Sequence, residues 1–229
     1  MSAPSIVIKA FGENAWLATV SGMETVAAAL YVNAAADRLR RKPGVLDCVA
    51  GIDSVVLRFN PPRLRAAEAK ALLAQTLFET PAAAQTAAKS IDIPVLYGGE
   101  AGPDLADLCK RLSLTPEQLI DLHSAQTYRV LTIGFAPGFA YLGPLPEALA
   151  APRLTSPRPH VPAGSVGIAG AMTGVYPLAS PGGWRIIGRT PKKLFDARAP
   201  ESFLFTPGVE VCFLPIDAKT FAAMERGEA

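Results

Sequence analysis

Four arginines are the residues of this sequence best suited to bind an anion. Arg153, Arg158, Arg185 and Arg189 lie in residues 124–193, a segment with seven basic residues and a single acidic one, Glu147. The planar guanidinium group binds a carboxylate or a phosphate through two parallel hydrogen bonds. A basic segment within a chain of net charge +2 is typical of a pocket for a small anion, although solvated surface arginines would give the same composition.

His123 is the candidate for proton transfer. It is expected at the end of a helix, shortly before the motif GFAPGF, where an imidazole could act as acid, base or anion ligand. The residues alone favour a second interpretation, in which His123 hydrogen-bonds the free carbonyls of the helix end. The other histidine, His160, lies in a proline-rich loop and is expected to be incidental.

Residues 134–191 are expected to form shaped loops and short strands around this chemistry. They hold 10 of the 19 glycines and 10 of the 21 prolines. The candidates for contacting a ligand or shaping its pocket are Phe135, Pro137, Gly138, Phe139, Tyr141, Ser165, Tyr176, Gly182, Gly183 and Trp184. Glycines before Trp184 would let backbone amides approach a ligand, but a barrel turn capped by a buried tryptophan explains them equally well. Ser165 is expected to form hydrogen bonds rather than to act as a nucleophile.

Several classes of site are excluded by what the sequence lacks. It has no GxxxxGK[ST] loop for nucleotide phosphates, and residues 124–193 cannot supply paired carboxylates. The remainder of an active site would therefore lie on another chain. Two histidines and three widely spaced cysteines argue against a protein-built metal site and against disulfides, so Cys48, Cys109 and Cys212 are expected to be buried thiols.

The charge and hydropathy patterns indicate a cytoplasmic protein that binds neither nucleic acid nor membrane. The net charge is +2, and the basic residues form no long run. The first residues lack the features of a signal peptide, and no stretch approaches the ~20 apolar residues of a membrane span.

The elements that must position these residues form two domains of an α+β protein. Apolar spacing and turn residues predict strands at 6–20, 46–51, 54–60 and 91–97, and helices at 25–41 and 65–79. This order is the ferredoxin-like βαββαβ pattern, which we assign to an N-terminal domain at residues 1–90.

A small β-barrel is predicted for residues 91–229. Helices are expected at 103–112 and 114–125, the second with a capping box between Thr115 and Gln118. Short strands are then expected at 128–133, 166–169, 185–189, 204–205 and 209–215.

Three long motifs carry a resemblance to a known family. They read GFAPGFAYLG, PR…SPR…VPAGSVGIAG and YPLASPGGWRIIGRTP. The chain resembles the family that includes allophanate hydrolase subunit 1, the B-type subunit of 5-oxoprolinase and the sporulation kinase inhibitor KipI, and the C/D half of the carboxyltransferase domain of urea carboxylases. The resemblance implies that the barrel is cyclophilin-like.

The same resemblance implies a function within a complex. The chain would be one component, inactive alone, of an ATP-dependent 5-oxoprolinase that opens the lactam 5-oxo-L-proline to L-glutamate. Its partners would be a larger sister subunit, of the allophanate hydrolase subunit 2 type or the C type of 5-oxoprolinase, and a further 5-oxoprolinase component of the A type. ATP, with Mg, would be bound by the partner subunits or shared with them. Arg153, Arg158 and Arg189 would hold carboxylate or phosphate, and His123 would transfer a proton.

Two other functions remain open at this point. One is a carboxyltransferase-type or allophanate-hydrolase-type subunit that acts on a urea-like amide, with biotin carried by a partner. The other is an inhibitor of a sensor histidine kinase. The chain also departs from the family pattern PGD.V.F, because Val209 stands where the aspartate is expected and Glu210 follows it. We expect either that Glu210 replaces that aspartate, if its carboxylate is needed, or that this chain acts on a different substrate.

Overall fold

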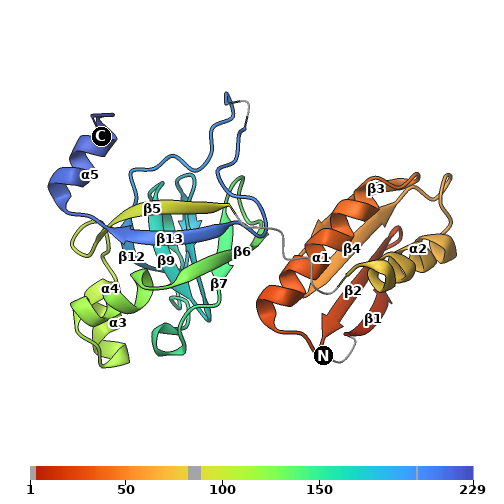
Figure 1. Ribbon diagram of the computed structural model, residues 1–229, viewed down its shortest axis with the longest axis horizontal. Coiled ribbons are helices and arrows are strands. Elements are labelled where there is room, and N and C mark those ends of the chain that lie inside the picture. The colour runs from red at the N-terminus through yellow and green to blue at the C-terminus, as the bar shows by residue number, and fades with distance from the viewer. Residues whose placement is uncertain (1–3, 82–88, 200, 229) are drawn as a thin grey trace. The chain divides into compact units, whose positions relative to one another are not determined.

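The computed structural model of the chain describes residues 4–81, 89–199 and 201–228. Within it the chain divides into two compact units, Met1–Ala87 and Ala88–Ala229, each of which has its own core. The predicted α+β class with a barrel in the second half is confirmed (Figure 1). None of the helices in these described ranges has both the length and the apolar composition to cross a membrane.

The first unit is a four-stranded antiparallel sheet with two helices. Its elements are β1 (Ser5–Ala10), β2 (Ala15–Ser21), α1 (Thr25–Arg40), β3 (Val45–Ala50), β4 (Ser54–Phe59) and α2 (Ala66–Glu79). The strands lie in the order β1-β2-β4-β3. Alternate residues of β4, namely Val55, Leu57 and Phe59, are buried, as expected of a sheet covered on one face.

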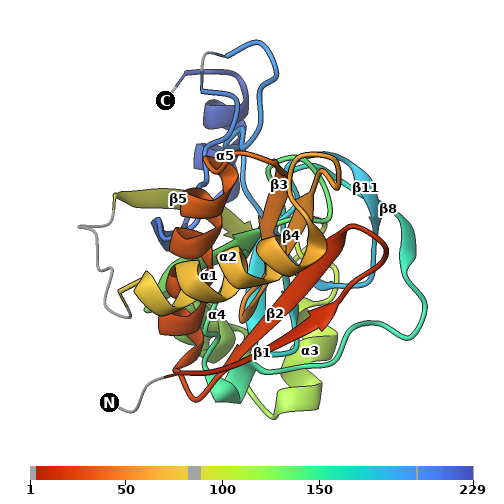
Figure 2. The same ribbon diagram turned by 90° about the vertical axis from the view of Figure 1, so that its right-hand side faces the viewer.

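Helices α1 and α2 supply the cover for that sheet (Figure 2). Tyr31 and Leu39 of α1 join Leu73 and Leu77 of α2 in one buried cluster with the sheet. The hydroxyl of Tyr31 also donates a hydrogen bond to the carbonyl of Leu77, which ties the two helices together. Burial of this apolar surface is the main stabilising term of the unit.

One strand lies in a different sheet from the one that the sequence pattern predicts. Residues 91–97 were counted as the last strand of the βαββαβ order, although the expected domain boundary at residue 90 placed them in the second domain. They form β5 (Ser90–Tyr97) of the barrel, while the edge of the first sheet is taken by β1. The sequence pattern could not separate these arrangements, because β5 is a mostly buried apolar strand that either sheet would accept.

The second unit is built around a closed barrel of seven strands. Its helices are α3 (Leu105–Leu112), α4 (Pro116–Ser124), the 3-10 turn η1 (Glu147–Leu149) and α5 (Ala218–Glu225). Its further strands are β6 (Thr127–Ile133), β7 (Ala140–Gly143), β8 (Arg158–Val161), β9 (Ser165–Ala169), β10 (Met172–Val175), β11 (Ser180–Gly182), β12 (Arg185–Arg189) and β13 (Glu210–Pro215). The barrel order is β10-β7-β6-β13-β5-β12-β9, and β8 and β11 pair separately as a two-stranded ribbon.

Local signals explain where the helices of this unit begin. The predicted capping box of α4 is confirmed, because the Thr115 hydroxyl accepts from the Gln118 N–H while the Gln118 side chain accepts from the Thr115 N–H. Helix α5, which the sequence interpretation missed, begins with the Asp217 carboxylate accepting from the Thr220 N–H. The prediction of a strand at 204–205 is wrong. In this part of the described chain an isolated bridge between Phe195 and Phe203 forms instead.

Candidate functional site

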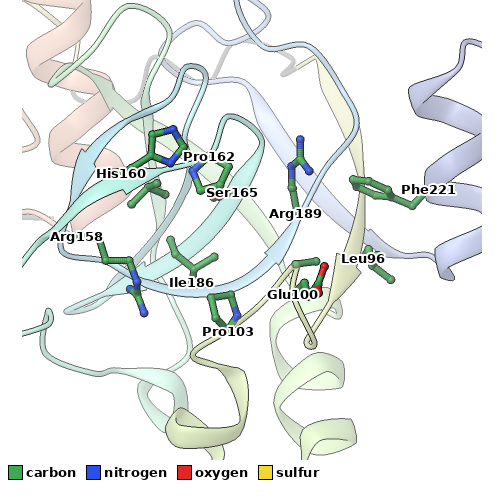
Figure 3. Close-up of a pocket in the computed structure, with 12 residues that line it drawn as sticks. Leu96, Glu100, Pro103, Arg158, His160, Pro162, Ser165, Ile186, Arg189 and Phe221 are labelled. Atoms are coloured by element: carbon green, nitrogen blue, oxygen red, sulfur yellow. The ribbon is translucent and has the colours of Figure 1, made fainter.

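A cavity of about 420 Å³ opens on the second unit and has two of the predicted arginines in its wall, which lie apart from each other in Figure 3. It is lined by Leu96, Glu100, Ala101, Pro103, Arg158, His160, Val161, Pro162, Ser165, Ile186, Arg189 and Phe221. Arg158 and His160 come from the ribbon strand β8, and Arg189 ends the barrel strand β12. A concave, mainly apolar wall with a few charged groups is the usual form of a small-molecule site.

Arg158 is held firmly at this cavity. Its Nη2 atom donates to the Asp104 carboxylate at 2.6 Å, and the other oxygen of Asp104 accepts from the backbone N–H of Ile186 at 2.6 Å. Only 9% of the Asp104 side chain is exposed. The Nη1 atom of Arg158 is buried and has no hydrogen-bond partner among the residues that the structure describes. An unsatisfied buried donor costs free energy, so a polar ligand atom or water that reaches it is favoured there.

Arg189 is held more loosely on the other side. Its Nε donates to the carbonyl of Ala163, and its Nη2 lies 3.4 Å from the Glu225 carboxylate of α5. The ring of Phe221, also on α5, lies 5.7 Å from the guanidinium carbon. The C-terminal helix therefore contributes both an aromatic wall and a counter-charge to the cavity.

Ser165 is placed by a tight turn that only glycine fits. The preceding residue, Gly164, has a φ of +82°, and a Cβ there would lie 2.3 Å from the carbonyl oxygen of Thr190. Backbone hydrogen bonds fix the turn, since Gly164 donates to Tyr176 and Thr190 donates to Gly164. The turn thus sets Ser165 and, one residue before Thr190, Arg189 at the same cavity.

The predicted aromatic residues form a separate cluster behind this cavity. Phe139, Tyr176 and Trp184 are buried together, with Tyr141 packed against them. The guanidinium of Arg153 lies 6.0 Å from the Trp184 ring and does not line the cavity. Val161 and Ile186 belong to both the cluster and the cavity wall, so the aromatic residues support the site from behind.

The loops of the cluster explain several glycines of the sequence. Gly182 lies against Tyr176, whose hydroxyl would be 2.3 Å from an added Cβ. Gly138, in the same loop as Pro137, has a φ of +80°. Gly183 lies near the Leu154 carbonyl and Pro157. Gly182 and Gly138 are therefore required by the packing and the backbone of the protein itself, which is the structural interpretation that the sequence left open, whereas the contacts of Gly183 would admit a side chain.

Phe135 has an unusual conformation in the GFAPGF loop. Its φ is +70°, and the N–H of Ala136 donates to the carbonyl of Gly134 across it, which makes a γ-turn. The residue remains 64% exposed, and its ring contacts those of Phe139 and Tyr176 edge to face. The loop therefore presents a large apolar side chain at a strained position.

His123 lies in the barrel core and does not line the cavity. The side chain is fully buried, its Nδ1 atom is 2.8 Å from the Tyr97 hydroxyl, and its Nε2 atom is 2.9 Å from the Thr173 hydroxyl. Burial lowers the pKa of His123 from 6.5 to about 3. Both ring nitrogens are thus engaged, and in this geometry neither reaches a ligand in the cavity.

Of the lining residues that were not predicted as site residues, three have ionisable or aromatic side chains. They are His160, Glu100 and Phe221. His160 could have been found, because residues two apart on a strand share a face and His160 follows Arg158 in β8. Glu100 follows the Gly98–Gly99 turn, and Phe221 is the one buried residue of α5. Neither carries a local sign of a ligand.

Two further expectations concern residues away from the cavity. Glu210, which follows the position of the expected aspartate, pairs with Arg129 at 2.6 Å across β13 and β6. Its carboxylate therefore has a structural partner.

The cysteines were all expected to be buried. This is confirmed for Cys48 and Cys109 but wrong for Cys212, which is partly exposed. Cys212 lies on a strand whose alternate residues, Val211 and Phe213, face the core.

Comparison with known proteins identifies the family. Residues 6–205 match the family model of the carboxyltransferase domain, subdomain C and D. The B-type subunit of the 5-oxoprolinase of Escherichia coli O157:H7 is 42% identical over 204 residues, which are 89% of this chain and 93% of that protein. The crystal structure of TTHA0988 is 34% identical with a TM-score of 0.77, and the match covers 90% of this chain but only 40% of that one.

A more distant structure shows the same fold. The urea carboxylase of Kluyveromyces lactis is 18% identical with a TM-score of 0.77, over 99% of this chain and 23% of that protein. With these neighbours the barrel is of the cyclophilin-like type that the resemblance implied. The chain belongs to the family of the carboxyltransferase domain, subdomains C and D.

Proposed function

We propose that this chain is the B-type subunit of a 5-oxoprolinase, an assembly that opens 5-oxo-L-proline to L-glutamate with the use of ATP. The observation that carries the proposal is the 42% identity to a B-type 5-oxoprolinase subunit over 89% of this chain. The cavity at Arg158 and Arg189 supports it, because its size and donors suit a small carboxylate. The partners in the proposal are two other subunits, one of them larger than this chain.

The proposed role of the cavity is to hold the substrate carboxylate. Opening of the lactam adds water across the ring amide, breaks its C–N bond and leaves a second carboxylate and an amine. The ring carboxylate does not react, so it can anchor the substrate through charge-assisted hydrogen bonds to Arg158 and Arg189. Ile186 and Phe221 offer apolar contacts to the ring.

The same cavity does not fit a nucleoside triphosphate. Each arginine already has a carboxylate partner, Asp104 or Glu225, and Glu100 adds a further acidic side chain to the wall. This charge balance suits a ligand with one negative charge rather than several. The proposal therefore assigns ATP and Mg to the partner subunits. The role of this chain in the proposal is to bind and orient the lactam.

The test is release of L-glutamate from 5-oxo-L-proline in the presence of ATP. The chain is assayed alone, with its candidate partner subunits, and in that mixture with Arg158→Gln. Activity is expected only in the mixture, and Arg158→Gln is expected to raise KM for 5-oxo-L-proline about tenfold or more, because a charge-assisted hydrogen bond is lost. Arg111→Gln, on the exposed face of α3, is the matched control and is expected to leave KM unchanged.

Three outcomes would contradict this proposal or favour another function. An intact, folded complex that releases no glutamate would overturn the proposal. Biotin-dependent carboxylation of a urea-like amide by the same complex would then favour the carboxyltransferase function. Inhibition of a purified sensor histidine kinase by the chain alone would favour the inhibitor instead.

A further inference from the structure

The two arginines of the cavity are held by ion pairs of different strength. Arg158 pairs at 2.6 Å with Asp104, whose carboxylate is nearly buried and is also fixed by the Ile186 N–H. Arg189 pairs at 3.4 Å with Glu225, and the two side chains are 39% and 44% exposed. One pair is short and sheltered, whereas the other is long and open to water.

This difference decides which arginine can change partners. Separation of a sheltered pair leaves an uncompensated charge, so Arg158 stays with Asp104. An exposed ion pair contributes little to stability, so a ligand carboxylate can replace the Glu225 carboxylate at little cost. The remaining contacts of Arg189, with the Ala163 carbonyl and the Phe221 ring, do not depend on Glu225.

Helix α5 supplies both the aromatic wall and the exchangeable carboxylate. Phe221 is buried against the cavity and Glu225 lies one helical turn further along, so both face Arg189 (Figure 3 shows Phe221 beside it). The helix packs against β5 and begins at a capped residue, Asp217.

We propose that Arg189 is the exchangeable carboxylate-binding residue of the cavity, and that Glu225 occupies it until a small monocarboxylate takes its place. The choice of 5-oxo-L-proline as that ligand rests on the proposed function, whereas the exchange itself does not. Phe221 restricts the ligand to one with a flat or apolar body beside its carboxylate. Glu100, on the same wall, disfavours a second negative charge.

The test follows the Arg189 Nε–H signal by nuclear magnetic resonance in the full-length chain. The signal is assigned with Arg189→Lys, and the chain is titrated with 5-oxo-L-proline, its uncharged amide 5-oxo-L-prolinamide, and acetate. The titrations are repeated with Glu225→Gln and with Glu225→Asp, whose shorter side chain cannot span the same distance. Glu228→Gln is the matched control, since Glu228 pairs with Arg226 and does not line the cavity.

Both Glu225 variants are expected to bind the two acids about two- to fivefold more tightly than the wild type, as the loss of an exposed competing pair predicts. Binding of the amide is expected to stay unchanged, as is all binding by Glu228→Gln. Unchanged or weaker binding of the acids by the Glu225 variants would overturn the proposal, and so would an Arg189 signal that neither acid moves. A response to acetate but not to 5-oxo-L-proline would support the exchange and contradict the proposed substrate.

Discussion

The Nε2 atom of His123 lies 2.9 Å from the hydroxyl oxygen of Thr173 in the centre of the barrel. The Thr173 hydroxyl donates its own proton to the Gly167 carbonyl, so it must accept from Nε2. The Nδ1 atom then accepts from Tyr97, whose pKa burial raises above its usual range. This network assigns a neutral imidazole with its proton on Nε2. His123 thus joins α4 to β5 and β10.

The first prediction concerns the pH dependence of stability. Burial lowers the pKa of His123 to about 3 from 6.5, so between these values the unfolded chain binds a proton that the folded chain does not. The contribution of the neutral His123 side chain to stability is complete above pH 6.5 and is lost as the pH falls toward 3. Over this range the free energy of unfolding falls by up to about 1.4 kcal/mol per pH unit. Urea denaturation from pH 7.5 to 4.5 measures this slope.

That experiment compares two matched variants, one at each histidine of the chain. His123→Gln is expected to be less stable at pH 7.5 and to have a flatter pH profile. His160→Gln, which removes an exposed imidazole, is expected to keep the wild-type profile. Equal slopes in the wild type and His123→Gln would show that the buried imidazole does not control acid stability.

The second prediction is that Asp104 holds Arg158 in place. Asp104→Asn removes a nearly buried charge and leaves the guanidinium without its counter-charge, which is expected to lower the free energy of unfolding by about 2 kcal/mol. Binding of 5-oxo-L-proline is expected to weaken in parallel. Asp37→Asn, which breaks the exposed pair with Arg40, is the control and is expected to cost less than about 0.5 kcal/mol. Equal costs for the two variants in urea denaturation would contradict the role of Asp104.

The third prediction separates two glycines of the same motif. Gly164 and Gly170 both have positive φ, but a Cβ at Gly164 meets the Thr190 carbonyl at 2.3 Å, whereas a Cβ at Gly170 meets nothing within 4 Å. Gly170→Ala is expected to cost about 1 kcal/mol from backbone strain alone. Gly164→Ala is expected to cost about 2 kcal/mol more and to weaken anion binding, because the turn that places Arg189 must shift. Thermal unfolding of both variants tests the difference, and similar melting temperatures would contradict it.

The fourth prediction concerns thiol reactivity. Burial raises the pKa of the Cys48 thiol to about 12 and also raises that of Cys109. Native protein at pH 8 is therefore expected to react with a chromogenic disulfide reagent at one thiol, Cys212, with the other two reacting only on unfolding. Cys212→Ser is expected to abolish the fast phase. A fast phase that persists in this variant would place an accessible thiol elsewhere.

Elements with a strong local signal were predictable from the sequence. The strand at Arg185–Arg189 and the capped helix α4 have the expected positions. Helix α5 was missed because Phe221 is its one buried residue, which leaves no apolar stripe to detect. Strand β8 was missed because its sequence, RPHV, contains a proline and pairs only with the short β11.

The candidate site was predictable in its residue types but not in its grouping. Arg158, Ser165 and Arg189 meet at one cavity, whereas Arg153 and the aromatic residues lie behind it and His123 lies in the core. This division depends on how β8, β9 and β12 are arranged, which is tertiary information that spacing along the chain does not contain. Glu225 and Phe221 could be placed at Arg189 only once the position of α5 was known.

The parallel pair of β5 and β13 has a consequence for how the chain folds. Strand β5 opens the barrel unit and β13 is its last strand, yet they lie side by side with Ile91 opposite Val211. Strand β13 hydrogen-bonds to both β5 and β6. During synthesis one edge of each of these two strands therefore stays unpaired until β13 leaves the ribosome. Barrel closure is therefore a late step of high contact order, with exposed strand edges until then. The first unit can fold well before this, because all of its residues are synthesised before those of the barrel.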